Sequence, residues 1–128
     1  MEFQVKLFNW QDQGNHLIIL TRGGMDSGAF KRLFDEIEVA TQDLSACKVL
    51  VDLSDSTFDL DGPDIQTLVA RLPLGHWRSH SKIAFVSGPE IADYHRLFFL
   101  RTELVARHLV ADVFRNPKVA IDWLAGMT

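Results

Sequence analysis

Aspartate is the residue type most concentrated in one segment of this sequence. The aspartates of that segment are Asp52, Asp55, Asp59, Asp61 and Asp64. Two or three carboxylates at the end of a strand can hold Mg²⁺ in an oxygen-rich site. Aspartates are also frequent in turns and at helix N-caps, where the short side chain accepts hydrogen bonds from free backbone N–H groups. Because Asp61 directly precedes Gly62 and Pro63, we expect turn and cap roles and no metal.

Five histidines and one cysteine are the other candidates for metal binding or catalysis. His76 and His80 would share one side of a helix, but Gly75 and the polar residues 78–79 predict a loop there. No third ligand has zinc-site spacing. Cys47 opens an apolar strand, where we expect a buried thiol, and no Gly-x-Ser-x-Gly elbow exposes a serine. We expect no catalytic residues, no metal and no cofactor; a hydrolase or metal enzyme using Asp and His is the less favoured alternative.

Two glycine-containing turns are predicted to link strand ends to helix starts. They are Arg22-Gly23-Gly24 and Ser87-Gly88-Pro89. In an open parallel sheet such turns meet at one edge, where ligands commonly bind, and helix N-termini there attract anions. Neither turn matches a dinucleotide or P-loop fingerprint. The alternative is that the glycines only allow tight turns.

The segment after Pro89 carries more apolar residues than one helical stripe can bury. We expect Leu97 and Phe98 to face the sheet, which leaves Phe99 or Leu100 toward solvent or a partner. Trp77, in a predicted loop over residues 73–81, either folds over this helix or is exposed with it. The resulting ligand-binding prediction comprises Trp77, Ser87, Gly88, Tyr94, Arg96 and Phe98.

The elements that must position these residues follow from apolar periodicity. Alternating or continuous apolar runs predict strands over residues 3–10, 16–21, 48–53, 82–86 and 111–114. Helical spacing, such as that of Phe30, Leu33, Phe34 and Ile37, predicts about four helices. The order is β-β-α-β-α-β-α-β-α. It predicts a mixed, mostly parallel β-sheet that begins with an N-terminal antiparallel hairpin, in a single α/β domain over residues 1–128.

Composition narrows the possible partners. Thirteen basic and 17 acidic residues give a net charge of −4, so we expect no nucleic-acid binding, which needs a basic face. Hydrophobic residues make up 47%, enough for one sizeable core. The longest apolar runs are far shorter than the roughly 20 residues of a membrane-spanning helix, and the first residues do not have the pattern of a signal peptide. We expect a cytoplasmic protein with no transmembrane segment.

The element order, together with several short motifs, resembles the STAS superfamily, and within it the bacterial SpoIIAA-like branch that is related to both STAS and CRAL-TRIO lipid-binding domains. The motifs are residues 49–53 leading to Asp61-Gly62, the strand 82–86, the helical segment 94–98, and the ending 113–116 with Ala120 and Trp123-Leu124. The resemblance covers essentially the whole chain and implies the SpoIIAA-like fold.

The resemblance also implies a switch position. In anti-sigma-factor antagonists, the loop after the third strand carries an Asp-Ser pair whose serine is phosphorylated by a partner kinase. The corresponding residues here include Asp59, Asp61 and Gly62, and no serine stands beside the helix start. The phosphoswitch therefore does not carry over. Either Asp61 mimics a phosphorylated residue or the switch is absent.

Two functions from different classes follow as expectations. The first is a non-enzymatic regulatory or protein-interaction module that lacks the phosphorylatable serine, binds a protein partner and forms a homodimer through its apolar surplus. The second, from the CRAL-TRIO side of the resemblance, is a carrier of a small apolar or anionic, lipid-like ligand.

Overall fold

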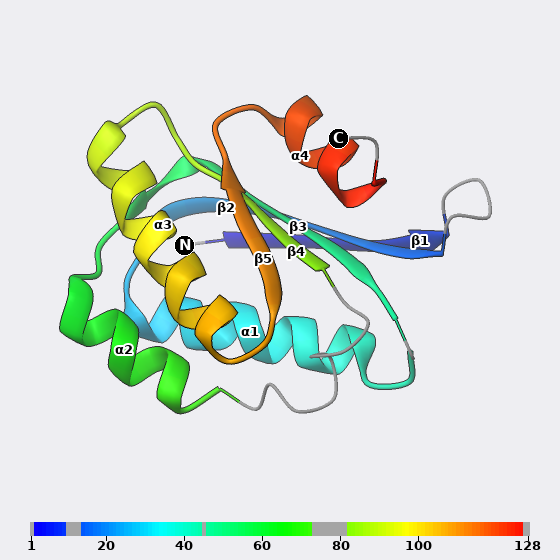
Figure 1. Cartoon of the computed structure of the whole chain (residues 1–128), viewed down its shortest axis with the longest axis horizontal. Helices are drawn as coiled ribbons and strands as arrows, with labels where there is room; N and C mark the ends of the chain where they lie inside the picture. The colour runs from blue at the N-terminus through cyan, green and yellow to red at the C-terminus, as the bar shows by residue number, and fades with distance from the viewer. Residues whose placement is uncertain (1, 10–13, 45, 73–81, 127–128) are drawn as a thin grey trace.

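In the described part of the chain, five strands form one sheet in the order in which they occur along the sequence (Figure 1). The computed structural model describes residues 2–9, 14–44, 46–72 and 82–126. The strands are β1 (Glu2–Asn9), β2 (Asn15–Met25), β3 (Lys48–Phe58), β4 (Lys82–Val86) and β5 (Val110–Phe114). β1 pairs antiparallel with β2, and the other neighbours pair in parallel. The predicted sheet and hairpin are confirmed.

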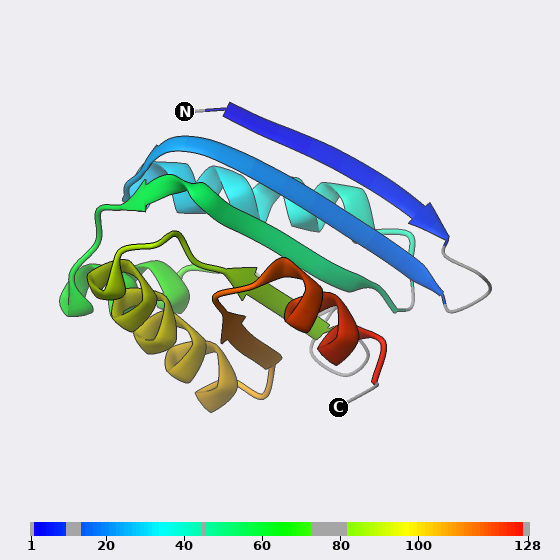
Figure 2. The ribbon, with the colours of Figure 1, turned by 90° about the horizontal axis from the view of Figure 1, so that it is seen from above.

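Each parallel strand is followed by a helix. The helices are α1 (Ser27–Thr41), α2 (Gly62–Ala70), α3 (Ile91–Ala106) and α4 (Pro117–Leu124). Because the strands are added in one direction and right-handed crossovers are strongly favoured, the three connecting helices lie on the same face of the sheet. α4 follows the last strand and lies on the other face (Figures 1 and 2).

Polar residues at the helix starts explain where these helices begin. Asp26 caps α1, with its Oδ1 accepting from the N–H of Ala29 at 2.9 Å. Asn116 caps α4, where Pro117 occupies the first turn. In both helices the cap satisfies a backbone donor that has no partner within the helix.

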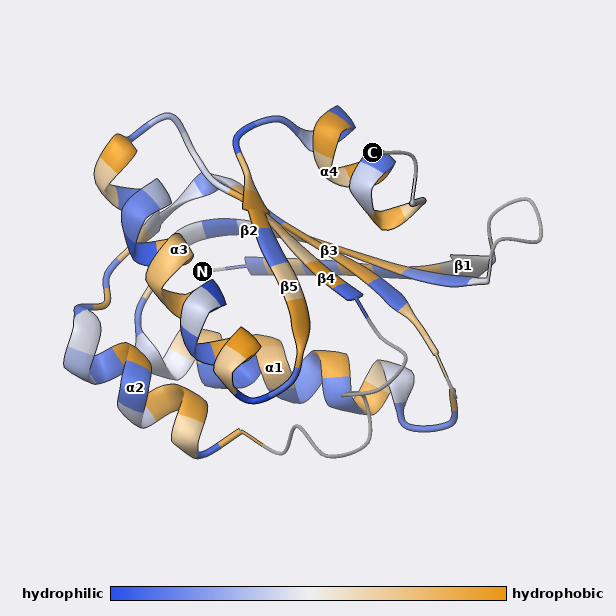
Figure 3. Ribbon diagram, viewed as in Figure 1, coloured by the Kyte–Doolittle hydropathy of each residue, from blue (hydrophilic) through white to orange (hydrophobic). Residues whose placement is uncertain are grey.

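The core has two unequal parts, one on each face of the sheet. The larger lies between the sheet and α1–α3 and includes Leu17, Val51, Phe85, Phe30 and Leu100. The smaller lies under α4 and comprises Leu50, Ala84, Val86, Ala120 and Leu124. β3 and β4 are therefore covered on both faces, which is why their sequences are continuous apolar runs. Figure 3 shows this concentration of hydrophobic residues along the central strands.

β2 and β3 run further than their sequence pattern predicts. The expected turn at Arg22-Gly23-Gly24 is wrong, since β2 continues to Met25. The strand predicted over residues 48–53 is too short, since β3 continues to Phe58. The two extensions pair with each other, residue 22 with residue 55 and residue 25 with residue 58.

A bulge accounts for these extensions. The pairing register shifts by one residue between Leu20 and Arg22, so β3 contains one more residue than β2 across this stretch. The Thr21 hydroxyl donates to the backbone oxygen of Asp52 at 3.1 Å and lies 2.6 Å from the Ser56 hydroxyl. The Asp52 carboxylate in turn accepts from the backbone N–H and the hydroxyl of Ser54. Side-chain bonds therefore replace the regular ladder, and residues typical of turns remain in strands.

Candidate functional site

The carboxyl ends of the parallel strands meet at one edge of the sheet, where the three connecting helices begin. β3 has 11 residues and its neighbour β4 has five, so the end of β3 projects past β4 toward the start of α3. The backbone of Gly88, which follows β4, lies against this projecting segment. A methyl group added at Gly88 would stand 3.3 Å from the Ser54 backbone oxygen. The absence of a side chain therefore permits this close approach.

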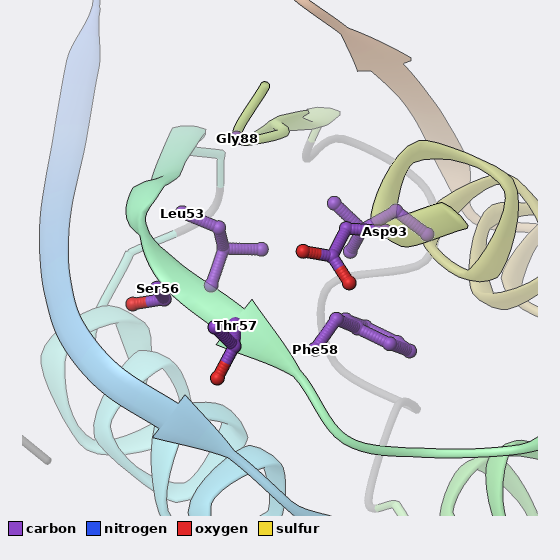
Figure 4. Close-up of a pocket in the computed structure, with 7 residues that line it drawn as sticks. Leu53, Ser56, Thr57, Phe58, Gly88 and Asp93 are labelled. Atoms are coloured by element: carbon purple, nitrogen blue, oxygen red, sulfur yellow. The ribbon is translucent and has the colours of Figure 1, made fainter. Parts of the chain in front are cut away.

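A small pocket lies between the projecting end of β3 and α3 (Figure 4). Its lining consists of Leu53, Ser56, Thr57, Phe58, Gly88, Asp93 and Leu97. Its empty volume is about 180 Å³, open solvent included. The Asp93 carboxylate extends from α3 toward β3, and the residue is only 8% exposed. Pockets for small organic ligands usually measure roughly 300–1,000 Å³, so this one fits at most a very small group.

Arg96 ties α3 to the end of β3 beside this pocket. Its Nη1 donates to the backbone oxygen of Phe58 at 2.9 Å and lies 3.7 Å from Oδ1 of Asp93. The Arg96 side chain is 48% exposed, so its charge still reaches the surface. Sequence reasoning named Arg96 but missed Asp93, although their three-residue spacing on a helix was a usable signal.

The predicted ligand-binding residues are only partly brought together. Ser87 is buried, and its backbone N–H donates to the backbone oxygen of Phe114 at 2.8 Å. Its hydroxyl has no hydrogen-bond partner among the described residues. Gly88 lines the pocket, whereas Tyr94 and Phe98 do not line it. Trp77 lies outside the described residues, as does the whole predicted loop over residues 73–81.

Tyr94 is partly buried against the large core and belongs to an aromatic and cationic group between α3 and the segment after β5. Its ring lies 6.4 Å from that of Phe98, and the Arg115 guanidinium lies 5.9 Å from the Tyr94 ring centroid. Arg115 also donates to the backbone oxygen of Pro89 at 3.2 Å, which ties the segment after β5 to the start of α3. Sequence reasoning missed Arg115 because only the parallel pairing of β4 and β5 brings it near α3.

Asp52 and Asp61, two of the acidic residues at this edge, accept hydrogen bonds within the chain. Asp61 is the N-cap of α2, and its Oδ1 accepts from the Asp64 N–H at 2.9 Å, as predicted. A side chain at Gly24 would stand 2.9 Å from Oδ2 of Asp59, so the Asp59 carboxylate lies against the β2 backbone. Gly62 lies beneath the ring of Phe99. Within the described ranges, no three Asp, Glu, His or Cys side chains are grouped as a metal site requires.

The outward face of α3 differs from the prediction. Leu97 and Leu100 are buried at 1% and 0% exposure, whereas Phe98 and Phe99 are 42% and 37% exposed. The expectation that Phe98 faces the sheet is therefore wrong. Leu97 is buried as expected, and of the two alternatives for exposure, Phe99 and Leu100, it is Phe99 that is exposed. Leu104 completes the buried stripe, because residues 97, 100 and 104 follow the three- and four-residue spacing of one helix face. We call Ile91, His95, Phe98, Phe99 and Val105 the α3 surface; all are exposed.

Cys47 is buried, as the sequence predicts, at 2% exposure. Burial raises the pKa of its thiol from 9.0 to about 11, because the thiolate would lose its hydration. A thiol in this state is a poor nucleophile at neutral pH.

In the described part of the chain, no helix combines the length and apolar character needed to cross a membrane. No family model matches the sequence, and no curated protein is detectably similar to it. The structure is similar to that of an uncharacterised protein of the DUF3478 family with a SpoIIAA-like fold from Shewanella loihica PV-4. The TM-score is 0.57 with 16% sequence identity, over 95% of this chain and 93% of that one. This chain therefore has the SpoIIAA-like fold.

Proposed function

We propose that this chain is a non-enzymatic protein-interaction module whose partner binds the α3 surface. The observation that carries the proposal is the pair of exposed aromatic rings, Phe98 and Phe99, on a helix whose opposite side is fully buried in the core. Aromatic residues are enriched at the cores of protein interfaces. A helix with a second apolar stripe that faces solvent is typical of a protein that buries this stripe against something else.

The α3 surface is held in place before any partner binds. The Arg101 guanidinium lies 5.2 Å from the Phe98 ring centroid, and its Nε donates to the backbone oxygen of Ala111 on β5. On the other side, Phe99 packs over Gly62 at the start of α2. Rings that are already ordered lose less conformational entropy on binding. Arginine beside aromatic rings also matches the composition of binding hot spots.

The start of α2 supports a module without a phosphorylation switch at this position. Residues 58–63 contain no serine, and Asp61 is engaged as a helix cap. Of the two alternatives that the resemblance leaves open, we therefore favour the absence of the switch over a phosphate mimic. A capping carboxylate already has a structural role, which needs no partner kinase to explain it.

The carrier function has less support from the pocket that Gly88 lines. The pocket between β3 and α3 has an empty volume of about 180 Å³, and lipid-like ligands need considerably more. Its single ionisable lining residue, Asp93, is a carboxylate paired with Arg96, so the pocket carries no excess positive charge to attract an anion. We therefore favour a protein partner.

A photo-crosslinking experiment tests the proposal. Benzoylphenylalanine is placed at Phe98, and in a matched variant at Val119, which is 47% exposed on α4. Both full-length proteins are irradiated in living cells of the source organism. We expect one discrete adduct with a second protein from position 98 and none from position 119. A Phe99→Ser substitution should then weaken formation of that adduct.

Two outcomes would count against the proposal. If both positions give the same adducts, the crosslinks report nonspecific proximity. If position 98 gives no adduct with another protein, although the purified variant retains the far-UV circular dichroism of the wild type, the α3 surface is not a docking site.

A further inference from the structure

β1 has a complete outer edge that no strand of the described chain pairs with. It is the first strand in the sheet order, and all eight of its residues are in register with β2 on its other side. Figure 2 shows β1 along the border of the sheet. The backbone N–H and C=O groups along such an edge can form a ladder with another strand. The strand contains no proline and is paired without a bulge, two of the devices that block edge pairing. Charged side chains are a third, so an incoming strand must match the charges of Glu2 and Lys6.

The apolar side chains of β1 are only partly covered. Val5 pairs with Ile19 and Leu7 with Leu17, so both point to the face of the sheet that holds the large core. They nevertheless remain 41% and 46% exposed. At the start of the strand, Phe3 is partly buried, with the Arg32 guanidinium 5.6 Å from its ring centroid.

α1 lies against the same face of the sheet as these side chains. Arg32 faces Phe3, and Val39 follows it seven residues later, which places it on the same side of the helix within about 20°. Val39 is 64% exposed. We call Phe3, Val5 and Leu7, which share one face of β1, the β1 strip.

We propose that the β1 edge binds a second copy of this chain, with the two β1 strands antiparallel about a two-fold axis at Gln4. In this register Glu2 faces Lys6 of the other copy, and Gln4 faces its own counterpart. On the opposite face, Phe3 meets Val5 of the other copy. Among residues 2–6, each cross-strand contact then joins opposite charges, amide to amide, or apolar to apolar.

Other registers lack this complementarity. A register centred on Val5 places the charged Glu2 opposite the apolar Phe8. A parallel pairing with residues aligned places Lys6 beside Lys6 and Glu2 beside Glu2, which is repulsive. The antiparallel arrangement also closes under two-fold symmetry, so it yields a dimer and not an open fibre.

The proposed dimer joins the two sheets into one and continues the β1 strip across the junction. It leaves the α3 surface free, because α3 packs near β5 at the opposite border of the sheet (Figure 2). The dimer and the partner site on α3 are thus independent. The sequence predicts a homodimer that forms through the surplus apolar residues of the long helix. We propose β1 as the dimer contact in its place.

Charge-swap variants of the full chain test the proposal by sedimentation equilibrium at low salt. We expect the wild type to dimerise, and Lys6→Glu or Glu2→Lys to raise the dimer dissociation constant on the order of tenfold, because two symmetric attractive pairs become repulsive. The double variant Glu2→Lys/Lys6→Glu should restore dimerisation. Lys118→Glu, which makes the same change in net charge at an 86% exposed side chain on α4, serves as the control and should behave as wild type.

The possible results of this experiment either support or overturn the proposed pairing. Recovery in the double variant supports the Gln4-centred pairing, since the two positions meet only between copies. A wild type that stays monomeric up to millimolar concentration overturns the proposal, as does a dimer that is insensitive to Lys6→Glu or a double variant that is not restored. Thermal unfolding of each variant confirms that the monomer is folded. Phe98→Ser, which addresses the partner site, should not change the dimer.

Discussion

Replacing Asp61 gives a quantitative test of the role assigned to this residue at the start of α2. Its Oδ1 accepts from the Asp64 N–H at 2.9 Å, so Asp61→Ala leaves that donor without its partner in the protein. Loss of such a cap typically costs about 1 kcal/mol, within a range of roughly 0.5–2 kcal/mol. α2 remains docked through Ile65, Leu68 and Val69, which are all buried, so the loss should be confined to the cap. For a domain of this size, about 1 kcal/mol lowers the Tm by about 3–5 °C.

Asp61→Ser distinguishes a cap from a charge requirement. Serine is nearly as good an N-cap as aspartate, so Asp61→Ser should unfold within about 0.5 kcal/mol of the wild type in urea titrations. If the carboxylate instead mattered as a permanent negative charge, serine would destabilise as much as alanine. That result, or an alanine variant as stable as the wild type, would refute the capping role.

Three further predictions concern two glycine contacts, the Cys47 thiol and the two faces of α3. Gly88→Ala should lower the free energy of unfolding by about 1 kcal/mol in urea titrations, because the new methyl group stands 3.3 Å from a backbone oxygen of β3. Gly24→Ala should lower it by less, because the atom 2.9 Å from its new methyl group is the end of the exposed Asp59 side chain, which can rotate away. Native Cys47 should resist iodoacetamide at pH 8, and its contribution to the free energy of unfolding should fall as pH rises from 9 to 11, because the unfolded thiol ionises first. In the same titrations, Leu100→Ala should lower the free energy of unfolding by about 3 kcal/mol, and Phe98→Ala by less than about 1 kcal/mol. Similar losses for the two variants would contradict the assignment of Leu100 to the buried face of α3 and Phe98 to the exposed face.

The sequence by itself determined the number, order and type of the elements. Continuous apolar runs identified β3 and β4 as strands covered on both faces, and helix-length segments between them required parallel pairing. The cap at Asp61 was also predictable, since capping depends on the few residues around a helix start. These features are local, or follow from local features through general rules of chain connection.

Tertiary structure alone decided where β2 and β3 end and which side of α3 is buried. Arg22 to Met25 and Ser54 to Phe58 have the composition of turns, and only their pairing across a bulge keeps them extended. On α3 both Leu97–Leu100–Leu104 and the α3 surface have helical spacing, so periodicity could not choose between them. The position of the sheet decides between them, because the leucine stripe packs against β3 and β5 and is buried, whereas the α3 surface faces solvent. Arg115 reaches Tyr94 for the same reason, since contacts between distant segments exist only once the chain has folded.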